Sequence, residues 1–121
     1  MGLKVSYLFD TNILIYYFNG DLSPEVKEIV TALMKQDFSL SIISKMEFLG
    51  FNQFTLEDKQ QANIFLSFSK ILALEEVVVE QVIQIKQTKK IKLPDAIIAA
   101  TALHYDMELV TRNTKDLVIL I

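Results

Sequence analysis

The chain has no cysteine and no tryptophan, and its 121 residues include only three glycines, two prolines and one histidine. Without cysteine there is no disulfide, no thiol nucleophile and no zinc–thiolate site, and we therefore expect a cytoplasmic protein. With so few glycines, the chain has no phosphate-binding loop, no Gly-x-Gly-x-x-Gly and no Gly-x-Ser-x-Gly motif. These absences exclude the usual nucleotide-cradling sites and serine hydrolases.

Basic residues do not predominate: 12 Lys and Arg stand against 15 Asp and Glu, for a net charge of −3. Such a domain has no overall attraction for nucleic acid, so a nucleic-acid substrate would need a local basic strip and a bridging metal. No run approaches the roughly 20 apolar residues of a membrane helix. Asp10 and Asn12 also interrupt the N-terminal apolar segment, which is unlike a signal peptide. We expect no association with membranes.

Apolar residues, by contrast, are abundant. They make up 51% of the chain, at or just above the usual globular range of about 45–50%. The length suits a single domain spanning residues 1–121 with a substantial core. We interpret the surplus as an exposed apolar patch, used in a dimer or for a partner. A well-filled core is the alternative.

Short apolar runs alternate with helical patterns along the whole chain. The predicted strands are Leu3–Phe9, Phe38–Ile43, Ile71–Glu75 and Glu108–Thr111, with Leu117–Leu120 as a possible last one. The predicted helices are Thr11–Phe18, Pro24 to about Gln36 behind a Ser23 cap, Ser44–Phe51, a segment from the Thr55 capping box to about Lys70, Val77–Lys90 and Pro94–Tyr105. Strands separated by helices predict an α/β fold, a three-layer α/β/α arrangement with a mostly parallel central sheet.

Three acidic residues stand where apolar segments start or stop. Asp10 ends the first strand, Glu47 follows the second, and Asp95 lies in the first turn of an apolar helix. In open α/β sheets, ligands bind beyond the carboxyl ends of the strands. Each acid alone has an ordinary explanation as a helix cap or first-turn acid. Together they indicate a site for a hard divalent cation, Mg²⁺ or Mn²⁺, which prefers oxygen ligands and can activate water beside a phosphodiester.

A fourth polar segment follows the predicted strand Glu108–Thr111. Asn113 and Asp116 can both supply oxygens, and Arg112 and Lys115 can meet phosphates. Lysines also precede the Asp95 helix, and they either line a path for RNA or form an ordinary solvated helix face: Lys86, Lys89, Lys90 and Lys92.

Four segments occur in order along the chain: Asp10-Thr11-Asn12, Ser44-x-x-Glu47, Leu93-Pro94-Asp95-Ala96-Ile97-Ile98-Ala99-Ala100-Thr101-Ala102 and Leu109-Val110-Thr111-Arg112-Asn113-x-x-Asp116. In this order they resemble a PIN domain and, more narrowly, the VapC-type ribonuclease toxins of toxin–antitoxin pairs. The resemblance spans essentially the whole chain. The chain departs from it at Asp116-Leu117, where Asp-Phe is usual.

The resemblance implies metal-binding roles for Asp10, Glu47 and Asp95, with either Asp116 or Asn113 as the fourth ligand. Thr11, Asn12 and Thr111 resemble residues that support the site by hydrogen bonding. The family also implies a PIN-like fold, hydrolysis of RNA with Mg²⁺ or Mn²⁺, homodimerisation and inhibition by a small antitoxin protein.

We therefore expect a metal-dependent endoribonuclease in which Arg112 and the lysines orient the RNA backbone. One alternative is a non-catalytic PIN-like module that binds RNA or protein. A second is a phosphotransfer enzyme with Asp10 as nucleophile. That chemistry is often marked by another Asp two residues on, and this chain has Asn12 there.

Overall fold

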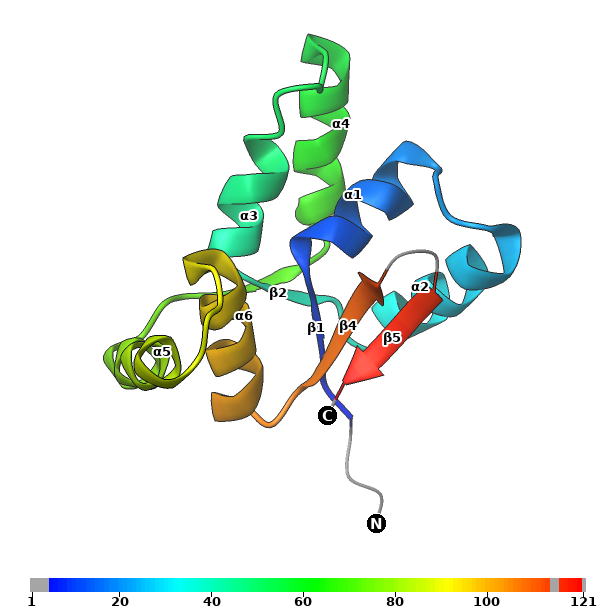
Figure 1. The fold of residues 1–121 in the computed structure, drawn as a ribbon. Coiled ribbons are helices and arrows are strands. Elements are labelled where there is room, and N and C mark those ends of the chain that lie inside the picture. The colour runs from blue at the N-terminus through cyan, green and yellow to red at the C-terminus, as the bar shows by residue number, and fades with distance from the viewer. Residues whose placement is uncertain (1–4, 114–115, 121) are drawn as a thin grey trace.

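A central sheet lies between two layers of helices in the computed structural model (Figure 1). The structure describes residues 5–113 and 116–120, of which 113 and 116–120 are described by their backbone alone. The strands are β1 (Tyr7–Phe9), β2 (Ser39–Ser41), β3 (Lys70–Leu72), β4 (Glu108–Asn113) and β5 (Asp116–Leu120). The helices are α1 (Thr11–Asn19), α2 (Pro24–Gln36), α3 (Ile42–Leu49), α4 (Leu56–Leu66), α5 (Glu76–Thr88) and α6 (Leu93–His104).

The sheet has the strand order β3-β2-β1-β4-β5. The first four strands in that order are parallel, and β5 runs antiparallel to β4. The predicted α/β class and the mostly parallel sheet are therefore confirmed. Because β1 is flanked by β2 and β4, its carboxyl end lies in the middle of the sheet edge where parallel strands finish. Asp10 follows directly at this point.

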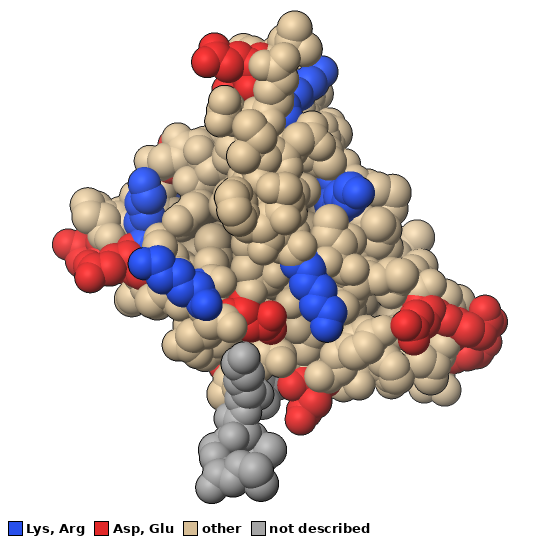
Figure 2. All heavy atoms as spheres, turned by 180° about the vertical axis from the view of Figure 1, so that it is seen from behind, with Lys and Arg blue, Asp and Glu red and all other residues tan. Residues whose placement is uncertain are grey.

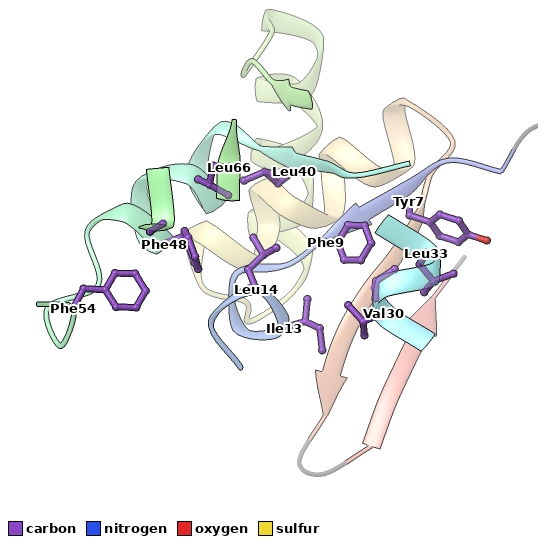
Figure 3. Close-up of a cluster of buried hydrophobic side chains, with 12 residues drawn as sticks. Tyr7, Phe9, Ile13, Leu14, Val30, Leu33, Leu40, Phe48, Phe54 and Leu66 are labelled. Atoms are coloured by element: carbon purple, nitrogen blue, oxygen red, sulfur yellow. The ribbon is translucent and has the colours of Figure 1, made fainter. Parts of the chain in front are cut away.

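Side chains of β1 alternate between the two helical layers, as the pleat of a strand requires. Tyr7 and Phe9 belong to a large buried cluster with residues of α1 and α2, shown in Figure 3. Leu8, between them, packs instead with Ile98 and Ala102 of α6. A strand with apolar residues on both faces must be covered on both sides, which is why the run lacks the polar alternation of a solvent-facing strand.

The aromatic part of the core lies around α3 and α4. Phe48 is fully buried, and its ring centroid lies 5.5 Å from those of Phe18 and Phe54 and 5.8 Å from that of Phe65. Most of the phenylalanines thus pack inside the molecule, but Phe68 keeps 78% of its surface exposed. Further exposed large apolar side chains stand on α4, α5 and α6, namely Leu56, Ile64, Val77, Ile83, Leu93 and Leu103.

Local capping residues fix several helix starts. Ser23 accepts the Val26 N–H ahead of α2, and Thr55 and Asp58 form the predicted capping box at α4. The start of α3 differs from the prediction: the helix begins at Ile42, not at Ser44. Ser41 is the cap, its hydroxyl accepting the Ser44 N–H at 3.4 Å. Ile42 and Ile43 suit a strand by residue type, but they are helical because the Ser41 cap starts the helix before them. Glu47 therefore stands in the second turn, not the first.

Other predicted boundaries were also wrong by a few residues. The described part of the first strand is only Tyr7–Phe9, and Leu3 and Lys4 lie outside the described residues. Helix α4 ends at Leu66, before Ser67 and Ser69 donate their hydroxyls to helix carbonyls. Strand β3 then ends at Leu72, and β4 extends to Asn113 because β5 pairs with it. Among the residues described, no helix combines the length and apolar character needed to cross a bilayer.

Candidate active site

A cavity of about 230 Å³ lies at the carboxyl edge of the sheet. It is lined by Asp10, Thr11, Asn12, Ile15, Glu47, Phe51, Asp95 and Ile98. These residues come from three parts of the chain that are far apart in the sequence: α1 with its cap Asp10, α3 with the residue Phe51 that follows it, and α6. The structure thus brings the three predicted acids, Asp10, Glu47 and Asp95, to one cavity.

Asp10 is held by the neighbouring strand β4 and by the helix α1 that it starts. Its N–H donates to the Val110 carbonyl at 3.1 Å, and its Oδ1 accepts the Ile13 N–H at 3.0 Å, so it caps α1. The Thr111 hydroxyl, from β4, donates to its Oδ2. Both carboxylate oxygens therefore have fixed partners, one in α1 and one in β4, and these partners set the orientation of the side chain.

Burial raises the pKa of the Asp10 carboxyl above its ordinary value. The negative charge of Asp95 raises the pKa further, while hydrogen bonds from the Ile13 N–H, the Thr111 hydroxyl and the Asn12 N–H lower it. The net increase means that the ionised form is disfavoured by its surroundings. A cation in the cavity would stabilise the ionised form and so offset that increase in pKa.

Glu47 is held from α1 across the cavity. The Thr11 hydroxyl lies 2.6 Å from Glu47 Oε1 and 3.1 Å from Ser44 Oγ. The Thr11 hydroxyl has a single proton, and the Glu47 carboxylate is both the nearer and the stronger acceptor. We infer that Thr11 donates to Glu47. The Ser44 hydroxyl then donates its own proton to the Thr11 oxygen. Since Ser44 is fully buried and Thr11 nearly so, this pair anchors an otherwise exposed carboxylate.

The donor set suits a hydrated hard cation. It consists of carboxylate, hydroxyl and amide oxygens, without nitrogen or sulfur ligands. Within the part of the chain that is described, no three His, Cys, Asp or Glu side chains stand close enough to ligate one ion directly. Mg²⁺ usually keeps several of its waters and takes only one or two carboxylates directly, so the cavity fits a hydrated ion better than a closed protein cage.

Comparison with known proteins agrees with the fold. A family model for the PIN domain matches residues 7–117. This chain belongs to the PIN domain family. No curated protein is similar enough to the chain to count as a match.

Solved structures extend this result. A toxin–antitoxin complex from Klebsiella pneumoniae contains a chain 36% identical to this PIN domain, with a TM-score of 0.72, covering 91% of this chain and 88% of that one. VapBC2 from Rickettsia felis, bound to a promoter DNA fragment, is 23% identical with a TM-score of 0.72 and coverages of 92% and 90%. VapBC-1 from nontypeable Haemophilus influenzae is 22% identical with a TM-score of 0.71 and coverages of 92% and 89%. At these low identities, the Rickettsia and Haemophilus structures support the fold alone. The resemblance predicted from the sequence is confirmed.

The last polar segment of the PIN domain is split between two places. Thr111 reaches Asp10, but the neighbouring Arg112 points to the opposite face of the sheet, with its guanidinium 4.1 Å from the ring centroid of Tyr16 on α1. Arg112 is absent from the cavity lining, and its Nε is buried without a hydrogen-bond partner among the described atoms. Alternation along β4 explains the split, since successive side chains point to opposite faces.

The remaining predicted residues cannot be placed in the cavity. The backbones of Asn113 and Asp116 pair with each other across β4 and β5, but their side chains lie outside the described part of the structure, as does all of Lys115. The choice between Asn113 and Asp116 as fourth ligand therefore stays a prediction.

The lysines before α6 are exposed, and one of them, Lys86, donates to the Ile91 carbonyl at 2.7 Å. On the face of the molecule turned away from Figure 1, basic and acidic side chains are interspersed (Figure 2). The described residues of that face form no continuous basic surface for a polyanion.

Four residues of the site were given no role in it by sequence reasoning. Ser44 holds Thr11, and Ile15, Phe51 and Ile98 form an apolar part of the cavity lining. For two of them helix spacing was an available signal: Ser44 precedes Glu47 by three residues and Ile98 follows Asp95 by three, so each shares a helix face with its acid. Phe51 lies beyond the end of α3, and its place in the lining depends on how the chain turns after Gly50.

Proposed function

We propose that this PIN domain is a metal-dependent endoribonuclease and the toxin of a VapBC-type toxin–antitoxin pair. The observation that carries the proposal is the meeting of Asp10, Glu47 and Asp95 in one cavity at the carboxyl edge of a PIN fold. The 36% identity to a chain of a toxin–antitoxin complex supports the toxin assignment.

Asp10, Glu47 and Asp95 would hold a hydrated Mg²⁺ or Mn²⁺, partly through the waters of the ion, with Asp116 or Asn113 as a further ligand. Such an ion activates water, neutralises phosphate charge and stabilises the leaving oxygen. The chain itself supplies orientation. Thr111 and the Ile13 N–H fix the Asp10 carboxylate, while Thr11 fixes Glu47, so the acids need little rearrangement before they act.

The partners follow from the same assignment. The substrate is RNA, and the exposed lysines of the α5–α6 connection together with Lys115 would contact its backbone. Arg112 is locked against Tyr16, which favours a role in positioning β4 beside Asp10. The exposed apolar side chains of α4, α5 and α6 leave surface for a second copy and for a small antitoxin protein. The proposed location is the cytoplasm.

The experiment is cleavage of a total RNA pool by the purified protein with Mn²⁺, Mg²⁺ or EDTA. We expect cleavage with either metal and none with EDTA. Asp10→Asn and Asp95→Asn should reduce cleavage to background with the fold intact. Glu57→Gln serves as the control, because Glu57 is an exposed acid in the first turn of α4, outside the cavity, and should retain activity. Wild-type protein that cleaves no RNA would instead favour the non-catalytic module.

A further inference from the structure

Part of the cavity wall is apolar and is not needed to bind a metal ion. Beside the acids the cavity is lined by Ile15, Phe51 and Ile98. Ile98 is buried at 4% exposure, whereas Ile15 and Phe51 are half-buried and so still present surface. A hydrated cation needs only oxygen donors and water, so an apolar wall in the same cavity indicates a ligand with both an anionic and an apolar part.

Phe51 is held firmly in that wall. Its N–H donates to the Phe48 carbonyl at 3.2 Å, and its carbonyl accepts the Phe54 N–H at 3.3 Å. Its ring packs edge-to-face on Phe54, with centroids 5.0 Å apart and ring planes at 74°. Because Phe54 is itself buried and joined to the Phe48 ring, the Phe51 ring is backed by the core. An aromatic surface fixed in this way loses little entropy when a flat ligand stacks on it.

The size of the cavity limits what this wall can take. About 230 Å³ is below the roughly 300–1,000 Å³ of sites that enclose a whole small molecule. The cavity therefore accommodates one unit of a larger ligand. A nucleotide combines the required features in one unit, because it has a phosphate for the acid and cation side and a flat apolar base for the other side.

We propose that Phe51, with Ile15 and Ile98, forms a seat for one unpaired nucleobase next to the phosphodiester that is cleaved. This proposal rests on the ribonuclease function proposed above and deepens it. A base within a duplex is stacked and paired and cannot reach a side wall, whereas an unpaired base can turn out and stack on an aromatic ring. Phe51 therefore acts in substrate selection, through a contact that the acids do not provide.

The test uses a fluorescent single-stranded oligoribonucleotide that the wild-type protein binds. Variants of this RNA carry an abasic nucleotide at each position in turn, and the cleaved bond is mapped where cleavage occurs. Phe51→Leu removes the ring, and Phe51→Tyr keeps it. Phe68→Leu is the matched control, because Phe68 is 78% exposed and is not part of the cavity. Binding in EDTA is followed by anisotropy, and cleavage with Mn²⁺ by kcat and KM.

We expect Phe51→Leu to weaken RNA binding by about 5- to 150-fold, the range for loss of one base–aromatic stack. Phe51→Tyr and Phe68→Leu should bind like wild type. One abasic position should weaken wild-type binding to the same extent and cause no further loss in Phe51→Leu, because the two changes remove the same contact. Equal binding by Phe51→Leu and Phe68→Leu, or wild-type protein indifferent to every abasic position, would overturn the seat.

Failure of the seat and failure of the ribonuclease are distinguishable. If Phe51→Leu cleaves RNA as well as the wild-type protein does, the seat is refuted and the ribonuclease function is retained. Weaker RNA binding by Phe51→Leu, with no cleavage by any variant, supports the seat and refutes the nuclease. The abasic substrates leave the protein unchanged, so the result does not depend on how well Phe51→Leu folds.

Discussion

Thr11→Val tests the hydrogen-bonded anchor of Glu47 most directly. Valine has nearly the shape of threonine, so the change opens no cavity and removes only the hydroxyl. Thr11 is 8% exposed and Ser44 fully buried, with 3.1 Å between their oxygens. Leaving a buried hydroxyl without its partner costs about 1–3 kcal/mol. The Glu47 contact adds little to stability because that carboxylate is exposed and regains water.

We therefore expect Thr11→Val to lower the free energy of unfolding by about 2 kcal/mol, through the orphaned Ser44 hydroxyl. Adding Ser44→Ala removes that orphan, so the double variant should be more stable than Thr11→Val alone. The coupling energy of this double-mutant cycle should be about 1 kcal/mol. Urea unfolding of the wild type, both single variants and the double variant measures it.

Cleavage should respond differently from stability. Thr11→Val and the double variant should both lose activity, because neither holds Glu47, whereas Thr11→Ser keeps the hydroxyl and should retain most of it. Ser41→Ala is a matched control: it removes the α3 cap from a residue as buried as Ser44 without touching Thr11. Strictly additive stabilities, or Thr11→Ser as damaging as Thr11→Val, would refute the hydrogen-bonded anchor.

Three further predictions concern the folding of the same region. The raised pKa of Asp10 means that its ionisation destabilises the fold as pH rises from the ordinary Asp pKa of about 4 through the folded value. Asp10→Asn, which can still cap α1, should therefore be more stable than wild type in thermal melts at pH 7 in EDTA, and the gain should vanish below about pH 4; an equal gain at both pH values would contradict this. Phe48→Ala should lower the free energy of unfolding by about 3–5 kcal/mol, because it empties a fully buried site among three rings; a loss under 1 kcal/mol in urea titration would show that the cluster is loosely packed. Gly20→Ala should cost about 1 kcal/mol, since Gly20 closes α1 at φ +75° with free space around its Cα, and Gly20→Asn should cost less; equal melting temperatures for all three proteins would contradict a conformational cause.

Much of the fold was predictable from the sequence because its signals are local. The Ser23-Pro24 start and the Thr55 capping box are complete within four residues, and the structure confirms both. The errors fell where a local signal was ambiguous. The apolar pair after Ser41 suits a strand as well as a helix, and the cap that decides between them is a single serine.

In the candidate site, too, some residues have a clear signal in the sequence and others do not. Asp10, Glu47 and Asp95 could be selected from the sequence because each stands near the start or the end of an apolar segment. In this sheet of parallel strands, the structure brings all three to one cavity at the carboxyl edge. Asn113 and Asp116 could not be separated, because either can supply an oxygen from the same polar segment of the sequence. The split between Thr111 and Arg112 depends on the pleat register of β4, which one sequence does not reveal.

The sequence by itself determined the family, the alternation of strands and helices, and the three acids at segment ends, because caps, periodicity and residue type act over a few positions. Only the tertiary structure decided what surrounds those acids: the Thr11–Ser44 anchor of Glu47, the stacking of Arg112 on Tyr16, and the apolar wall of Phe51 and Ile98. These contacts join segments tens of residues apart. Their formation depends on strand register and on the packing of helices against the sheet, and no short stretch of sequence encodes either.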